Sequence, residues 1–104
     1  MADIYHALIK HTLAEVPTES LQEYGDNCHS AVMAINSALS LIGNLTFEAS
    51  QSEDYPDTDA KRDLFLVGSV LRNLPRIAQA LEHNSGLVEH EMRVRNAQAG
   101  ANHD

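Results

Sequence analysis

Residues 28–49 read CHSAVMAINSALSLIGNLTFEA, and this stretch decides the fold. Its apolar side chains recur at alternating spacings of three and four residues over three heptads, which is typical of a helix that buries one side against another helix. Ala34 and Leu41 widen the apolar stripe, so we expect this helix to touch two neighbours. The stripe itself consists of Cys28, Ala31, Val32, Ile35, Ala38, Leu39, Ile42, Leu45, Thr46 and Ala49.

A second long helix is predicted after a polar connection at residues 50–56. Its apolar residues have the same periodicity: Ala60, Leu64, Val67, Leu71, Leu74, Ala78 and Leu81. Two long helices joined by a short polar segment favour an antiparallel αα-hairpin with helices at about 27–50 and 57–83. Pro75 is expected to kink the second helix, because its ring clashes with a backbone carbonyl of the preceding turn.

Shorter helices are predicted on either side of this hairpin. Apolar residues at helical spacing predict a first helix over residues 3–16, which Pro17 ends. Gly25 and Asp26 then interrupt the chain before the long helix begins. The sequence therefore predicts an all-α protein, a small antiparallel helical bundle built on the hairpin.

The C-terminal part of the chain is expected to be less regular. Residues 83–86 (HNSG) are typical of a helix C-cap, and a short last helix is predicted after them. Residues 97–104 form a polar tail that we expect to be disordered. The predicted organisation is therefore one helical domain over residues 1–96 followed by the tail.

Charge and composition exclude several classes of function. The chain has 104 residues, a net charge of −8 and one cysteine, and ten of its acids lie in residues 1–59 with Lys10 as the one base there. An acidic chain is repelled by nucleic-acid backbones and anionic lipids. The lone Cys28 fits a reducing compartment, and no uninterrupted apolar run approaches the ~20 residues of a membrane span. We expect a cytoplasmic protein that binds neither nucleic acid nor membrane directly.

Catalytic and metal-binding patterns are not found in the sequence. The six histidines lack the spacings of a metal site, and Glu89, His90 and Glu91 point in different directions on a helix. The chain has no phosphate-binding loop and no nucleophile motif. We therefore expect no enzymatic activity, no metal and no cofactor.

Several apolar and basic residues fall outside the predicted buried stripes. On the second long helix, Phe65 lies about 160° from Val67, on the same outer side as Lys61, Arg72 and Arg76. On the first long helix, Met33 and Phe47 also point outward. Aromatic and arginine side chains are enriched in binding hot spots, so these six residues are candidate partner-binding residues. The alternatives are that a shorter helix covers them as core, or that they are exposed without a role.

A second candidate feature is the acidic set Glu15, Glu19, Glu23 and Asp26. Carboxylates in such a cluster could imitate the phosphates of DNA and block a DNA-binding protein. Acidic clusters also occur simply as solvated surface, and the sequence leaves both interpretations open.

Three runs of the sequence resemble the derepression proteins of phage satellites. They are DNCHSAV at 26–32, LSLIGNLTFE at 39–48, and RDLF at 62–65 continuing to LPRIAQALE at 74–82. The resemblance covers most of residues 4–90. It implies a small antirepressor in a bacterial host, which binds the immunity repressor of a helper prophage and stops it from holding its operator DNA.

The sequence thus predicts an antirepressor that acts by protein–protein contact with a transcriptional repressor. The alternative is an acidic DNA mimic or another inhibitor of a host nucleic-acid enzyme, such as an anti-defence protein. A third possibility is a purely structural dimerisation module. Because two long apolar stripes with few aromatic residues give one chain a marginal core, we also expect a homo-oligomer.

Overall fold

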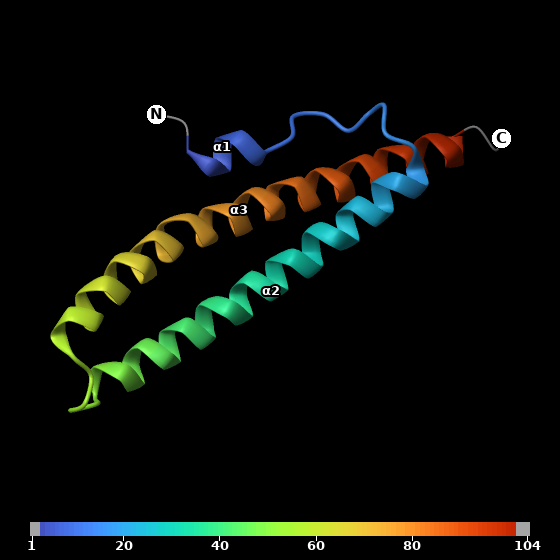
Figure 1. Cartoon of the computed structure of the whole chain (residues 1–104). Helices are drawn as coiled ribbons and strands as arrows, with labels where there is room; N and C mark the ends of the chain where they lie inside the picture. Colours follow the sequence, from blue (N-terminus) through green and yellow to red (C-terminus); the bar gives the residue numbers. More distant parts are fainter. Residues whose placement is uncertain (1–2, 102–104) are drawn as a thin grey trace.

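The computed structural model describes residues 3–101, which form three helices. They are α1 (Ile4–Leu8), α2 (Thr18–Ser50) and α3 (Asp57–Ala101). The two long helices pack against each other and run in opposite directions, joined by residues 51–56, while α1 lies against α3 (Figure 1). No strand occurs within residues 3–101, so the all-α prediction is confirmed.

The molecule is long and thin. Its Cα atoms extend over 73 × 28 × 15 Å, and their radius of gyration is 19.8 Å. A compact domain of this length would have a radius of gyration of about 13 Å. Most of each long helix therefore has one helical neighbour and is otherwise open to solvent.

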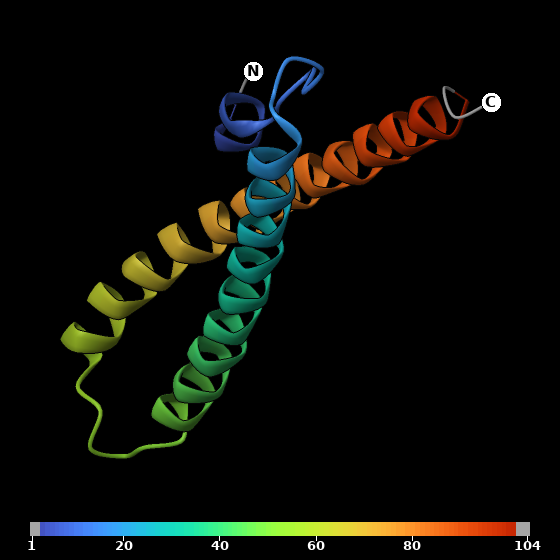
Figure 2. The same ribbon diagram turned by 90° about the vertical axis from the view of Figure 1, so that its right-hand side faces the viewer.

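The buried core lies near the start of α2, where the two long helices cross (Figure 2). Gly25 of α2 makes the close approach possible, because a Cβ atom at this position would lie 2.8 Å from a methyl group of Val88. Cys28 is buried in the same region, as its place in the apolar stripe predicts. The other buried hydrophobic residues are Leu13, Leu21, Val32, Ala78, Ala80 and Val88.

The predicted first helix over residues 3–16 is wrong beyond its first turns. Helix α1 ends at Leu8, and residues 9–17 run as a non-helical segment beside α3 (Figure 1). In a helix, the backbone groups of this segment would bind one another; here, two side chains of α3 bind some of them instead. Asn84 accepts from the N–H of Lys10, and Arg95 donates to the carbonyls of Leu13 and Ala14.

The predicted breaks within the long helices are absent. Helix α2 begins at Thr18, directly after Pro17, and continues through Gly25 and Asp26. Helix α3 likewise continues through residues 83–86, so there is no separate C-terminal helix within the described chain. It also includes residues 97–101 of the tail expected to be disordered, whereas residues 102–104 lie outside the described part.

Pro75 lies inside α3 and does not end it. Proline has no backbone N–H to donate to the carbonyl of the preceding turn. A proline inside a helix that is held by neighbouring elements therefore bends the helix without ending it. Helix α3 is bowed along its length rather than sharply broken (Figure 1). The bow leaves α2 and α3 close together at the core and further apart toward the loop.

Candidate protein-interaction surface

Exposed apolar side chains are concentrated next to the connecting loop. We call residues 33–50 of α2 and 57–72 of α3 the loop-proximal half. Within residues 3–101, Val94 is the one exposed large hydrophobic residue outside this half. Those inside it are Met33, Leu41, Leu45, Phe47, Leu64, Phe65, Leu66 and Leu71. Exposed apolar side chains gathered in one part of a molecule are typical of interaction sites.

The three apolar residues predicted to point outward are all exposed. The side chain of Phe65 is 77% exposed, that of Phe47 67% and that of Met33 58%. Helix α1 does not cover them, since it packs against α3 beyond the loop-proximal half. The interpretation of these residues as core beneath a shorter helix is therefore wrong for this fold.

Two of the predicted basic residues lie beside Phe65. Lys61 and Arg72 are exposed and lie one turn before it and two turns after it on α3. We call Lys61, Phe65 and Arg72 the outer stripe. Neither base has an ion-pair partner among the described residues, so both charges face solvent.

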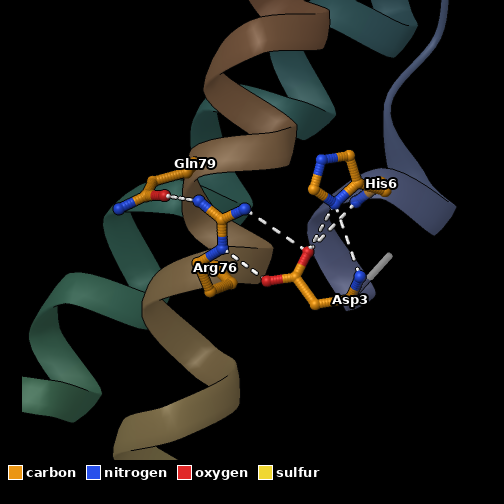
Figure 3. Close-up of polar contacts among 4 residues, drawn as sticks. All are labelled: Asp3, His6, Arg76 and Gln79. Atoms are coloured by element: carbon orange, nitrogen blue, oxygen red, sulfur yellow. Dashed lines mark hydrogen bonds and ion pairs between the residues drawn. The ribbon is translucent and has the colours of Figure 1, made fainter. Parts of the chain in front are cut away.

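Arg76 was predicted to belong to this stripe, but it binds the N-terminal segment. Its Nε and Nη2 atoms donate to the two carboxylate oxygens of Asp3 at 2.7 and 3.3 Å, and its Nη1 donates to Gln79 at 2.6 Å (Figure 3). The guanidinium also lies over the ring of Tyr5, 4.3 Å from the ring centre. Arg76 therefore fastens α1 to α3.

The carboxylate of Asp3 is held by a second group. It caps α1 by accepting from the backbone N–H of His6, and it lies 2.9 Å from Nδ1 of the His6 ring (Figure 3). The hydrogen bonds from Arg76, above all, hold the pKa of Asp3 well below its usual value. Reciprocally, the ionised Asp3 raises the pKa of Arg76.

A groove opens between α2 and α3 beside the loop. It has a volume of about 700 Å³. Most of its lining is apolar, from Ile42, Leu45, Ala49, Ala60, Leu64, Leu66 and Val67. The periodicity of the sequence does not indicate this groove, because it places Leu64 and Leu45 in the closed helix–helix contact. Their large exposure shows that the contact is incomplete there.

The polar edge of this groove is fixed by Tyr55 and Asp63. The Tyr55 hydroxyl donates to the Asp63 carboxylate, and Arg62 donates to the other oxygen of the same carboxylate. These bonds raise the pKa of Tyr55 and lower that of Asp63. The contact ties the loop to the first turns of α3 at the edge of the groove.

The acidic and histidine side chains of the described residues are dispersed. Within residues 3–101, no three His, Cys, Asp or Glu side chains converge on one point. The acidic set is present as exposed surface: Glu15 lies in the segment before α2, and Glu19, Glu23 and Asp26 lie on one side of its first turns. The chemistry that the surface offers is therefore contact by apolar, aromatic and charged groups.

Helix α2 is long and apolar enough to cross a bilayer, which the sequence analysis did not anticipate. Its most apolar 18-residue window has a mean hydropathy of 1.3 and is only 6% buried. Helix α3, however, packs beside it with Lys61, Arg62 and Arg72 in the adjoining half. Each such charge costs about 3 kcal/mol at the centre of a membrane helix.

No protein-family model, curated protein or solved structure is significantly similar to this chain.

Proposed function

We propose that this chain is an antirepressor that binds a phage immunity repressor through the loop-proximal half and keeps it from its operator DNA. The observation that carries the proposal is the exposure of Phe65 at the centre of the outer stripe. The repressor as partner, and the bacterial cytoplasm as location, rest on the resemblance to derepression proteins of phage satellites.

The outer stripe has the composition of a binding hot spot. An exposed phenylalanine loses little when it remains in water, but its burial in a partner's pocket removes a large apolar area from solvent. Lys61 and Arg72 add positive charge to a protein of net charge −8. A partner with an apolar pocket between acidic side chains fits this arrangement. The acidic surfaces elsewhere on the chain would repel the same acidic side chains, which disfavours other orientations of the partner.

Met33 and Phe47 extend the proposed partner surface to α2. They are exposed on the same half of the molecule as Phe65. Side chains from both helices offer a larger contact area than a single stripe does, which is closer to the size of a protein interface.

The proposal is tested in a lysogenic host that carries a reporter gene under the control of the prophage repressor. Expression of the wild-type chain should switch the reporter on and capture the repressor, identified by mass spectrometry. Phe65→Ala should do neither, while Asn73→Ala, an exposed change on the same helix, should behave as wild type. A silent reporter in every lysogen that is susceptible to satellite derepression would contradict the proposal.

The exposed acidic set favours one other function. On the solvent side of α2, three carboxylates follow one another at helical spacing, those of Glu19, Glu23 and Asp26. A DNA-binding protein could accept this row of negative charges in place of phosphates. Binding by this set would weaken steeply with salt, whereas binding through Phe65 would change little. Partner affinity measured at two salt concentrations separates the two mechanisms.

A further inference from the structure

Helix α2 carries a second apolar stripe that the described part of the chain leaves largely uncovered. Ala34, Ala38, Leu41 and Leu45 are spaced by four, three and four residues. Ala34 and Leu41 lie on the outer side of α2, and Ala38 and Leu45 lie on the edge that the second stripe shares with the stripe facing α3. The side chains of Leu41 and Leu45 are 58% and 56% exposed. Within residues 3–101, α2 packs against α3 but does not meet α1. The second neighbour expected for α2 is therefore missing from the single chain.

We propose that this second stripe binds the same stripe of a second copy of the chain, with the two α2 helices antiparallel. Centred between residues 39 and 40, such a pairing places Ala34 opposite Leu45 of the other copy, and Ala38 opposite Leu41. Every leucine then meets an alanine. This alternation of large and small side chains is what closely packed helices require. The stripe is thus complementary to itself in one register and orientation.

The charge distribution also selects a second copy as the occupant. Residues 27–47 contain no Asp, Glu, Lys or Arg, although the whole chain has a net charge of −8. Two identical acidic chains repel each other wherever acids face acids, and this stretch of α2 avoids that repulsion. Glu48, the one charge within the overlap, lies opposite Ala31 in the proposed register. A different protein as partner would not require such neutrality, because opposite charges could then be paired.

The surface of the chain is large enough for this interface. Its solvent-accessible area is 7810 Å², whereas a compact monomer of this mass would expose about 5,800 Å². An overlap of residues 29–50 is about 33 Å long. With α3 alongside, each copy would contribute a strip about 20 Å wide, so the pair would bury roughly 1,300 Å², within the range of stable protein interfaces. The dimer would be a four-helix arrangement with α2 and its counterpart at the centre.

This dimer is independent of the proposed antirepressor activity. Phe65 lies about 160° around α3 from Val67, which lines the groove beside α2, so it points away from the α2–α2 contact and stays exposed in the dimer. One dimer would then present two copies of the outer stripe, which suits a repressor that is itself symmetric.

The mass of the protein in solution tests the dimer. Light scattering during size-exclusion chromatography should give twice the chain mass of 11.4 kDa. Leu41→Asp should raise the dimer dissociation constant by at least about a hundredfold, because the symmetric interface would contain the buried charge twice. Phe47→Asp adds the same charge to an exposed apolar position on the other side of α2, and it should remain dimeric. A wild-type monomer at all concentrations, or the reverse behaviour of the two variants, would overturn the proposal.

Cysteine pairing tests the register with changes that disturb folding little. In the proposed dimer, residues 34 and 45 of opposite chains lie level, whereas two copies of residue 34 lie about 16 Å apart along the helix axis. A disulfide needs Cα atoms within about 7 Å. Ala34→Cys and Leu45→Cys should therefore form disulfide dimers when mixed, but not when oxidised separately. Self-linking of either variant alone would show a parallel dimer or another register, and failure of the mixture to link would also refute the proposed one.

Discussion

The guanidinium of Arg76 holds the carboxylate of Asp3, 73 residues away in the sequence, through two hydrogen bonds while it lies over the ring of Tyr5. A helix as short as α1 is not stable by itself. Its place against α3 therefore depends on contacts of this kind, and Arg76 supplies three of them to two residues of the N-terminal segment.

Arg76→Ala is expected to release α1 and leave the long helices intact. Amide hydrogens of residues 5–9 should exchange faster in this variant, because local opening no longer breaks the contacts with Asp3 and Tyr5. Arg72→Ala removes the same group from an exposed position one turn earlier and should leave this exchange unchanged. Equal protection of residues 5–9 in wild type and Arg76→Ala would show that the contact does not hold α1.

Acidification should weaken the same contact. Because the pKa of Asp3 is lowered when α1 is attached, its ionisation stabilises the attached state fully above its ordinary pKa of 3.8. This contribution is lost as the pH falls through the lowered pKa. An NMR titration of the Asp3 carboxyl carbon should show a pKa below 3.8 in the wild type and a higher pKa in Arg76→Ala, because the largest of the lowering interactions is removed. The same titration curve for both proteins would contradict the contact.

Asn84 is the buried polar anchor of residues 8–10. It accepts from the N–H of Lys10 at 2.7 Å and donates to the carbonyl of Leu8 and to the Tyr24 hydroxyl, both at 3.0 Å. Asn84→Ala leaves these groups without their partner, so the free energy of unfolding should fall by about 2–3 kcal/mol. Asn73→Ala on exposed α3 should change it by less than about 0.5 kcal/mol. Thermal melting at one protein concentration compares them, and equal melting temperatures would refute the anchor.

Two glycines of α2 should respond in opposite directions to the same substitution. Gly25→Ala places a methyl group 2.8 Å from Val88, so overpacking should cost about 1–3 kcal/mol of stability. A Cβ atom at Gly43 would have nothing within 4 Å, so Gly43→Ala should gain up to about 1 kcal/mol from helix propensity. Urea denaturation measures both. Stabilisation by Gly25→Ala would mean that the helix crossing is looser than described.

The periodicity of residues 28–49 and 57–83 predicted the helical class and the residues that begin the core, such as Cys28 and Val32. The prediction of helix ends failed where residues that locally favour a break or a cap are held inside a helix by tertiary contacts. Gly25 has the local signature of a break, but it lies inside α2 where Val88 of α3 leaves no room for a Cβ atom. Asn84 belongs to a sequence typical of a helix C-cap, but α3 continues through it. The side chain of Asn84 instead forms hydrogen bonds with the backbone of Leu8 and Lys10. Such long-range hydrogen bonds leave no periodic trace in a sequence.

The candidate surface was partly predictable for a related reason. Phe65 stood out because it lies opposite an apolar stripe, and the structure leaves it exposed. Arg76 shares that side of α3 but is engaged by Asp3, a residue from the far end of the chain. The exposure of Leu64 and Leu71 was not predicted, because periodicity indicates which side of a helix is apolar but not whether a neighbour covers it.

The most direct test of the central claim, that the outer stripe binds a partner protein, is a binding titration of the captured repressor with Phe65→Ala. Because Phe65 is exposed, this variant should keep the melting temperature of the wild type. Its dissociation constant should rise by about thirtyfold or more, the effect of removing a hot-spot residue worth about 2 kcal/mol. An unchanged dissociation constant would contradict the account, as would a loss of stability large enough to explain weaker binding.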